Sequence, residues 1–322
     1  MVRIGFVLDH ISGSDINWLF ETIDEVLSRD NHSLEELLRQ DYRTENPNHA
    51  IDILLLINIK NTYHLDDLLG KIYSNVRDIL MQRDLTLLPL NVLLGNFNKQ
   101  DLYWDHIFLL DPSILNNYDI QFGTLEKIIH SSLKMDDSNS INNNNTQAST
   151  IDQYSKNPNQ SVDQDRYKMT AVGGTFDHIH DGHKILLTMA AFLTSKRLII
   201  GLTDEELLVN KKFKECMESF SKREDNVLEF LHILKPQLLV DIIPLHDVCG
   251  PTGTVPEIEC LIVSRETVKG GEIVNRTRRE RGFNELKIIV VNVLGGDERD
   301  GWKEKLSSTE IRKILSTQAS TK

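Results

Sequence analysis

The chain has few of the residues and segments that mark several large classes of protein. It contains only three cysteines in 322 residues, Cys216, Cys249 and Cys260, and none of them forms a CxxC pair. This sparse, odd set argues against a disulfide framework and against a zinc site, and it fits a reducing compartment. No apolar run is long enough to cross a bilayer, and no signal-peptide segment follows Met1. These absences predict a cytoplasmic protein that does not bind membranes.

Positive charge is also scarce. Lysine and arginine number 36 against 48 acidic residues, which gives a formal net charge of −12. A general nucleic-acid binder needs a basic face, so we expect no nucleic-acid partner. The basic run at 276–281 is the main local exception. It can be either a solvated helix face or a phosphate contact.

An asparagine-rich segment divides the chain. Residues 136–165 contain almost no large apolar side chains. Such a segment cannot bury enough surface to offset the entropy lost on ordering. We therefore predict an N-terminal domain over residues 1–135, a disordered linker over 136–165 and a C-terminal domain over 166–322.

Apolar runs alternate with helical patterns on both sides of this segment. In the N-terminal part the patterns predict strands at 3–8, 51–58, 88–94 and 106–110 and helices at 17–28, 65–81 and 124–133. In the C-terminal part they predict strands at 169–172, 198–202, 239–244, 260–263 and 288–293 and helices at 183–194, 225–234, 271–281 and 308–315. This alternation predicts two α/β domains with largely parallel sheets. No internal repeat stands out. The N-terminal part carries no phosphate loop, so its sequence does not reveal its role.

The most informative segment is GGTFDHIHDGH, at residues 173–183, between a predicted strand and a predicted helix. Unpaired backbone N–H groups and the positive end of a helix dipole make such a helix start suitable for binding an anion. Histidines at this position can donate hydrogen bonds to phosphate oxygens. The loops after the next two strands, at 203–204 and 247–254, would open at the same edge of a parallel sheet. The segment therefore predicts a nucleotide site.

Two motifs together resemble the nucleotidylyltransferase superfamily. The HxGH motif is His180-Asp181-Gly182-His183, and an SSTxxR motif follows near the C-terminus, from Ser307 to Arg312. Three further stretches resemble the eukaryotic phosphopantetheine adenylyltransferases. The stretches are GLTD at 201–204 with Lys211, DIIPL at 241–245 with Gly250-Pro251, and SRETVKGG at 264–271 with Asn275 and Arg278. The resemblance covers residues 167–315. The chain departs from bacterial members, which carry arginines near residues 264–267.

The resemblance implies a Rossmann-like C-terminal domain with a doubly wound parallel sheet. It also implies transfer of AMP from ATP to 4′-phosphopantetheine, which yields dephospho-coenzyme A and pyrophosphate, with Mg²⁺ accompanying ATP. Because the attacking phosphate is already an anion, catalysis would rest on positioning and on stabilising charge, without a strong general base. No carboxylate cluster in the sequence suggests a metal site made only of protein ligands.

The resemblance also implies roles for individual residues. Catalytic roles fall to His180, His183, Lys211 and Arg312, with Lys212 as the alternative to Lys211. The implied ATP contacts are Gly173, Gly174, Thr175, Phe176, His183, Arg278, Ser307, Ser308 and Thr309, and the implied phosphopantetheine contacts are Thr175 and Lys211. Each group also has a purely structural interpretation, as helix caps for the histidines and serines and as a solvated loop residue for the lysine. Asp177 can orient a histidine or simply close the turn.

Other functions remain open at this stage. A nicotinamide-mononucleotide or choline-phosphate nucleotidylyltransferase would share part of the motif set. A different class is a scaffold subunit of a complex that makes coenzyme A, with the N-terminal domain binding other enzymes of the route. From the sequence alone, a shortened chain that begins near Asp165 is expected to keep its activity.

Overall fold

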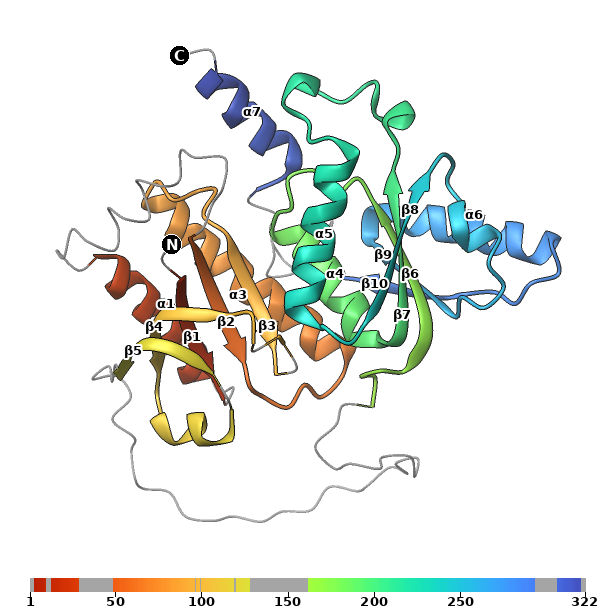
Figure 1. The fold of residues 1–322 in the computed structure, drawn as a ribbon. Coiled ribbons are helices and arrows are strands. Elements are labelled where there is room, and N and C mark those ends of the chain that lie inside the picture. The colour runs from red at the N-terminus through yellow and green to blue at the C-terminus, as the bar shows by residue number, and fades with distance from the viewer. Residues whose placement is uncertain are drawn as a thin grey trace.

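The computed structural model describes residues 3–9, 13–28, 49–95, 97–98, 100–118, 120–127, 162–292 and 306–319. They form two α/β regions, an N-terminal region (residues 3–127) and a C-terminal region (residues 162–319), each with one five-stranded sheet (Figure 1). Most of the predicted linker lies outside the described residues. Its last part, residues 162–165, forms a turn.

The N-terminal region contains a parallel sheet with the strand order β3-β2-β1-β4-β5. Its elements are β1 (Arg3–Leu8), α1 (Gly13–Ser28), β2 (Ala50–Leu55), α3 (Thr62–Gln82), β3 (Leu90–Leu94), β4 (Tyr103–Leu109), the 3-10 helix η2 (Pro112–Asn117) and β5 (Gln121–Lys127). Every residue of β1, β2 and β3 is buried, which explains their nearly continuous apolar runs. The helix predicted at 124–133 is wrong for residues 124–127, which belong to β5, and the rest of it lies outside the described residues.

The C-terminal region contains a second parallel sheet, with the order β10-β9-β6-β7-β8. Its strands and α-helices are β6 (Tyr167–Gly174), α4 (Asp181–Leu193), β7 (Thr194–Thr203), α5 (Phe220–Leu234), β8 (Leu239–Leu245), β9 (Cys260–Ser264), α6 (Val268–Glu280), β10 (Lys287–Val291) and α7 (Ser308–Ala319). Short 3-10 helices are η4 (Glu205–Leu208), η5 (Lys214–Cys216), η6 (Gly250–Gly253) and η7 (Arg265–Thr267). The predicted doubly wound α/β fold is confirmed.

The two sheets share one topology. If the strands of each region are numbered in chain order, both sheets have the spatial order 3-2-1-4-5. This is the strand order of doubly wound nucleotide-binding sheets. The sequence shows no repeat, so the likeness between the two regions is one of topology.

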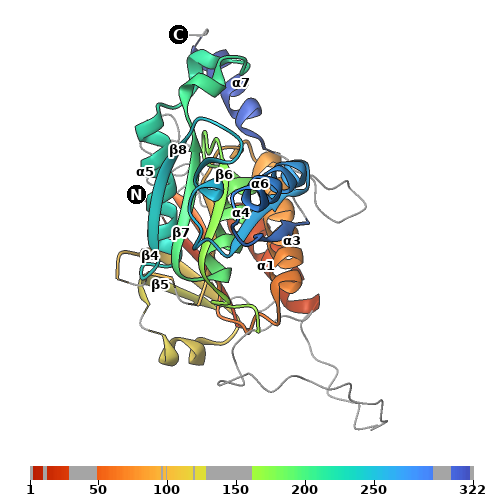
Figure 2. The ribbon, with the colours of Figure 1, turned by 90° about the vertical axis from the view of Figure 1, so that its right-hand side faces the viewer.

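The side chains of the C-terminal sheet alternate between two apolar clusters. Val172 and Ile200 belong to the larger cluster, which includes α4 and α5 and continues into the N-terminal region. Ala171 and Ile199 point the other way, into a smaller cluster with Val274 of α6. Accordingly α6 lies on the outer side, while α3 and α4 lie next to each other where the two regions meet (Figures 1 and 2). The two regions thus share one hydrophobic core.

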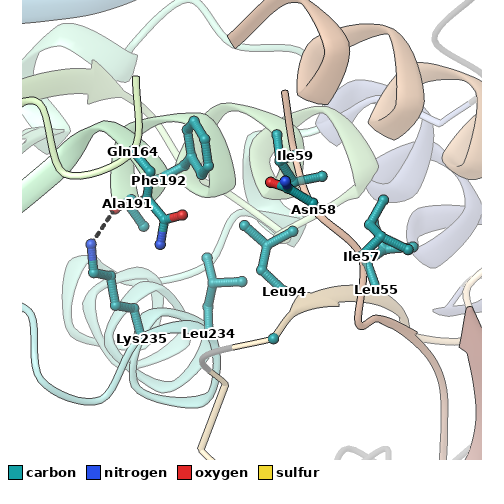
Figure 3. Close-up of a pocket in the computed structure, with 11 residues that line it drawn as sticks. Leu55, Ile57, Asn58, Ile59, Leu94, Gln164, Ala191, Phe192, Leu234 and Lys235 are labelled. Atoms are coloured by element: carbon teal, nitrogen blue, oxygen red, sulfur yellow. Dashed lines mark hydrogen bonds between the residues drawn. The ribbon is translucent and has the colours of Figure 1, made fainter. Parts of the chain in front are cut away.

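A cavity of about 210 Å³ lies at one end of this junction (Figure 3). The N-terminal region lines it with the segments that follow β2 and β3, including Ile59 and Gly95. The C-terminal region lines it with Phe192 and Leu234, at the ends of α4 and α5. Beside it, the Lys235 ammonium donates to the Ala191 carbonyl at 2.9 Å and so caps the end of α4. The opposite end of α4 carries the predicted nucleotide site.

Candidate active site

The loop between β6 and α4 has an unusual backbone conformation. Phe176 and His178 have positive φ angles of 49° and 45°, a region that residues other than glycine rarely adopt. Phe176 is fully buried, and its ring packs on the His183 ring with centroids 5.2 Å apart. A Cβ at Gly174 would lie 3.0 Å from the Phe176 ring, so a larger residue there would press on the ring. Gly174 and Phe176 therefore help to place His183.

The two histidines of HxGH stack on each other at the start of α4. The ring centroids of His180 and His183 are 3.9 Å apart with an interplanar angle of 35°. Burial, assisted by the charges of Arg77 and Lys184, lowers the pKa of His180 to about 3. Burial, His180 and Lys211 lower the pKa of His183 well below its usual value. Both rings are therefore neutral at pH 7, and a neutral imidazole keeps one N–H donor.

Neither histidine acts as a simple helix cap. His180 stands at the N-cap position of α4, but its side chain makes no capping hydrogen bond. The His183 Nδ1 atom is buried and has no hydrogen-bond partner within the described ranges. The structural interpretation of the pair as capping residues is therefore not what the structure shows.

An ion pair joins this loop to α7. The Asp177 carboxylate is fully buried and accepts a hydrogen bond from Arg312, and it also accepts one from the Glu218 amide at 2.9 Å. The same carboxylate lies 3.9 Å from the His178 Nε2 atom, so it also stands beside a histidine of the loop. It connects the HxGH loop to the helix of the SSTxxR motif.

Arg312 is turned toward the protein in this structure. Besides Asp177, its guanidinium donates to the Lys212 carbonyl at 2.9 Å and to the Thr309 hydroxyl at 3.2 Å. Its side chain is almost fully buried. The resemblance implied a catalytic contact for Arg312, whereas these bonds make it the anchor of the N-terminal end of α7.

The remaining SSTxxR residues lie at that same helix end. The Ser307 hydroxyl accepts from the Glu310 amide at 3.3 Å and so caps α7. Ser308 is the first residue of the helix and is half-buried, and Thr309 is exposed. The start of α7 therefore offers backbone N–H groups and hydroxyls near the HxGH loop, to which Arg312 ties it.

Lys211 and Lys212 contribute in different ways. Both side chains are exposed. The Lys211 ammonium is close enough to His183 to lower the pKa of that histidine, whereas Lys212 contributes its carbonyl to Arg312. Of the two alternatives, Lys211 is the one whose charge reaches the histidine pair.

Three contacts that the sequence did not suggest hold the loop in place. Arg223 of α5 donates to the carbonyls of Thr175 and Thr203 at 2.8 and 2.9 Å, so it joins the ends of β6 and β7. A His178 ring nitrogen lies 2.6 Å from the Cys216 carbonyl. The pattern contains no signal for these bonds, because a carbonyl partner leaves no trace in the sequence.

Arg278, for which the resemblance implied an ATP contact, is bound to protein carbonyls in this structure. Its guanidinium is fully buried and donates to five backbone carbonyls, those of Thr252, Val255, Pro256, Ile258 and Asn284. A guanidinium has five N–H donors, so none remains for a phosphate. Arg278 holds the loop that follows η6.

Two general properties concern the described residues alone. No helix among them is both long and apolar enough to cross a membrane. They contain no group of three or more histidine, cysteine, aspartate or glutamate residues that could hold a metal ion.

Known proteins resemble the chain over both regions. Residues 171–314 match the cytidylyltransferase-like family. The chain is 44% identical over 278 residues to the phosphopantetheine adenylyltransferase of Saccharomyces cerevisiae, with 84% of each protein covered. The enzyme of that name from Pyrococcus abyssi is 37% identical over 147 residues, which are 90% of its own length but only 46% of this chain. The one from Pyrobaculum aerophilum is 32% identical over 151 residues, which are 93% of its own length and 47% of this chain.

The parallel sheet, the HxGH helix and the cytidylyltransferase-like match define a nucleotidyltransferase. The long match to the yeast enzyme is more specific, because it covers most of both proteins. The chain belongs to the phosphopantetheine adenylyltransferase family. The members of this family are nucleotidyltransferases of coenzyme A biosynthesis.

Proposed function

We propose that the chain transfers AMP from ATP to 4′-phosphopantetheine, giving dephospho-coenzyme A and pyrophosphate. The observation that carries this proposal is the stacked pair of neutral histidines at the start of α4, with Lys211 beside it. A phosphate oxygen of the acceptor forms a bond to the α-phosphorus of ATP, and the bond from that phosphorus to the bridging oxygen of pyrophosphate breaks. The attacking oxygen is already anionic, so no side chain has to remove a proton.

The residues at the site then have distinct tasks. His180 and His183 donate N–H groups to the phosphates of ATP, and charge on the reacting α-phosphate is stabilised by donors that are already in place. Lys211 adds a positive charge on the open side and contacts the attacking phosphate with the Thr175 hydroxyl. Ser308 and the other N–H groups at the start of α7 bind the outer phosphates, as helix starts do. Gly173 and Gly174 line the path of the nucleotide at the end of β6.

We propose that Mg²⁺ enters with ATP as part of the substrate. Mg²⁺ keeps several of its waters and is commonly held by phosphates together with one or two carboxylates. It would offset part of the triphosphate charge, and the histidines and Lys211 would bind phosphate oxygens as well. We place the reaction in the cytoplasm, because Cys216, Cys249 and Cys260 are all free thiols in the structure. Association with other enzymes of coenzyme A synthesis through the N-terminal region stays a prediction.

The first experiment measures pyrophosphate release from ATP and Mg²⁺ with 4′-phosphopantetheine, phosphocholine or nicotinamide mononucleotide as the acceptor. We expect turnover with phosphopantetheine alone. His183→Ala should lower kcat by about 100- to 1,000-fold, the usual effect of losing one donor to a charged transition state. His64→Ala, at the far end of α3, is the matched control and should behave as the wild type. Turnover with another acceptor would overturn the substrate, and full activity of folded His183→Ala would overturn the site.

A further inference from the structure

We propose that the N-terminal region is part of the catalytic machinery, because Arg77 and Asn91 hold the first turn of the HxGH helix in its working position. Arg77 lies on α3 and Asn91 on β3, and neither touches the reacting atoms, so both are positioning residues. The inference rests on the proposed function, since it concerns the same histidine pair.

The first contact is a buried ion pair inside the HxGH motif itself. Arg77 donates through Nε and through one terminal nitrogen to the two carboxylate oxygens of Asp181, at 2.7 and 2.8 Å. Both side chains are less than 5% exposed, at 3% and 4%. The second terminal nitrogen of Arg77 donates to the carbonyls of Thr86 and Leu88, which anchors the guanidinium in the N-terminal region. The planar fork therefore fixes Asp181 in both position and direction.

The second contact is one position beyond His183. The buried ammonium of Lys184 donates to the Leu90 carbonyl at 2.9 Å and to the Asn91 side-chain oxygen at 2.8 Å. The Asn91 amide in turn donates to Asp52 at 2.7 Å, and Asp52 also accepts from Trp104 at 2.8 Å. A buried chain of hydrogen bonds thus runs from the core of the N-terminal sheet to α4.

These two contacts enclose the histidine pair. Asp181 follows His180 directly, and Lys184 follows His183 directly. The His180 side chain makes no capping hydrogen bond to its own helix, so contacts from outside the helix contribute to holding this first turn. Arg77 also cancels the charge of Asp181, which would otherwise stand beside the place where an anionic substrate binds. The N-terminal region therefore both aims the two donors and removes a repulsive charge.

The relatives agree with a role for the N-terminal region in this chain. The described C-terminal region begins at residue 162 of 322, so the 278-residue match to the yeast enzyme extends far into the N-terminal region. The archaeal matches are confined to about half of this chain. An enzyme of this family can therefore have the catalytic half alone, but here α4 is built against a second region.

The test compares Arg77→Met and Asn91→Ala in the full-length protein. We expect kcat to fall by about 100-fold for Arg77→Met and about 10-fold for Asn91→Ala, since a displacement of about 1 Å at a reacting group has effects of this size. The matched control is Asn98→Ala, which removes a different contact between the regions, to His232 of α5 at 3.1 Å. Its kcat should stay within about twofold of the wild type, because α5 does not carry the histidines.

A second readout separates positioning from a general loss of stability. The charges that face His180 come from Arg77, Lys184 and His178, and all three lower its pKa. Arg77→Met removes one of them and leaves Asp181 without its partner, so the NMR signals of the His180 ring should titrate at higher pH than in the wild type. Asn98→Ala should leave that titration unchanged, because it alters no charge near His180.

The outcomes distinguish the two proposals. Wild-type kcat and an unchanged His180 titration in folded Arg77→Met, with His183→Ala inactive, would overturn the positioning role and leave the site intact. Full activity of His183→Ala would overturn the site itself. If Arg77→Met does not fold, Asn91→Ala decides, and a kcat equal to that of Asn98→Ala would contradict the proposal.

Discussion

At the residue scale, the buried histidine pair makes stability depend on pH. The pKa of His180 is about 3 in the folded protein, below the value of about 6.5 expected in the unfolded chain. As pH falls below about 6.5, the unfolded state takes up a proton that folded His180 does not. The contribution of His180 to stability is therefore complete above that pH and is lost progressively toward pH 3.

This predicts a measurable difference between the wild type and His180→Asn. From about pH 6 to pH 4.5, the unfolding free energy of the wild type should fall by about 1.4 kcal/mol per pH unit more than that of the variant, the effect of one proton. Urea unfolding at several pH values measures both slopes. Val162→Ala, a change at an exposed side chain that carries no titratable group, is the control and should keep the wild-type slope. Equal slopes for wild type and His180→Asn would show that His180 is protonated in the folded state.

Sequence patterns predicted the kinds of side chain at the site better than their directions. The motif placed His180 and His183 at the start of a helix, and the structure stacks them there. The resemblance implied an ATP contact for Arg278 and a catalytic role for Arg312, and in the structure both guanidinium groups are buried and bound to protein acceptors. The position of the charged group on a long flexible side chain depends on which carbonyls and carboxylates it meets. These partners are distant in the sequence, so a local pattern does not contain them.

At the element scale, the Asp177–Arg312 pair makes α7 and the HxGH loop one unit. We predict that Asp177→Asn and Arg312→Met each destabilise the protein by about 3–5 kcal/mol, because each leaves a buried charge without its partner. Both should also weaken ATP binding, although Asp177 carries the wrong charge to touch a phosphate. Thermal or urea unfolding and the KM for ATP measure the two effects.

The double variant identifies the cause. If the residues act through each other, Asp177→Asn/Arg312→Met should be less impaired than the sum of the single changes, by about 0.5–3 kcal/mol. Additive effects on the KM for ATP, with Asp177→Asn close to the wild type, would instead show that Arg312 binds phosphate directly.

The one misassigned element in the described part of the N-terminal region also has a physical reason. Within the described residues, β5 is an edge strand paired with β4, and most of its described side chains are exposed. An exposed edge strand lacks the apolar signature of the buried strands, so residues 121–127 resembled a polar helix or loop. The strands β1, β2 and β3 were predicted because every one of their residues is buried, even though β3 also lies at an edge of the sheet.

At the scale of the whole molecule, two sheets of the same strand order face each other across α3 and α4. The patterns of apolar residues predicted both sheets, since each strand is encoded locally. They did not predict the equivalence of the two topologies or the shared core. Strand order depends on connections in space, and side chains can change without altering it. The sequence predicted two domains joined by a linker. The structure adds a buried polar interface between the two regions.

This interface changes the outcome expected for the C-terminal region alone. Deleting residues 1–161 would expose Phe192 and Leu234, which now face the N-terminal region, and would remove the partners of Asp181 and Lys184. We therefore expect a protein that aggregates more readily, melts at a lower temperature and has a kcat lower by about 100-fold, as for Arg77→Met. Some activity should remain, because the archaeal relatives match this region alone.

Calorimetry, size-exclusion chromatography and pyrophosphate release measure these three properties. Adding His183→Ala to the shortened protein is the control, and it should remove the remaining turnover if that turnover comes from the same site. A shortened protein with full kcat and unchanged melting temperature would mean that the first turn of α4 takes its position without help. The ion pair between Arg77 and Asp181 would then only join the regions, and the orientation of the histidines would be a property of the C-terminal sheet and its own helices.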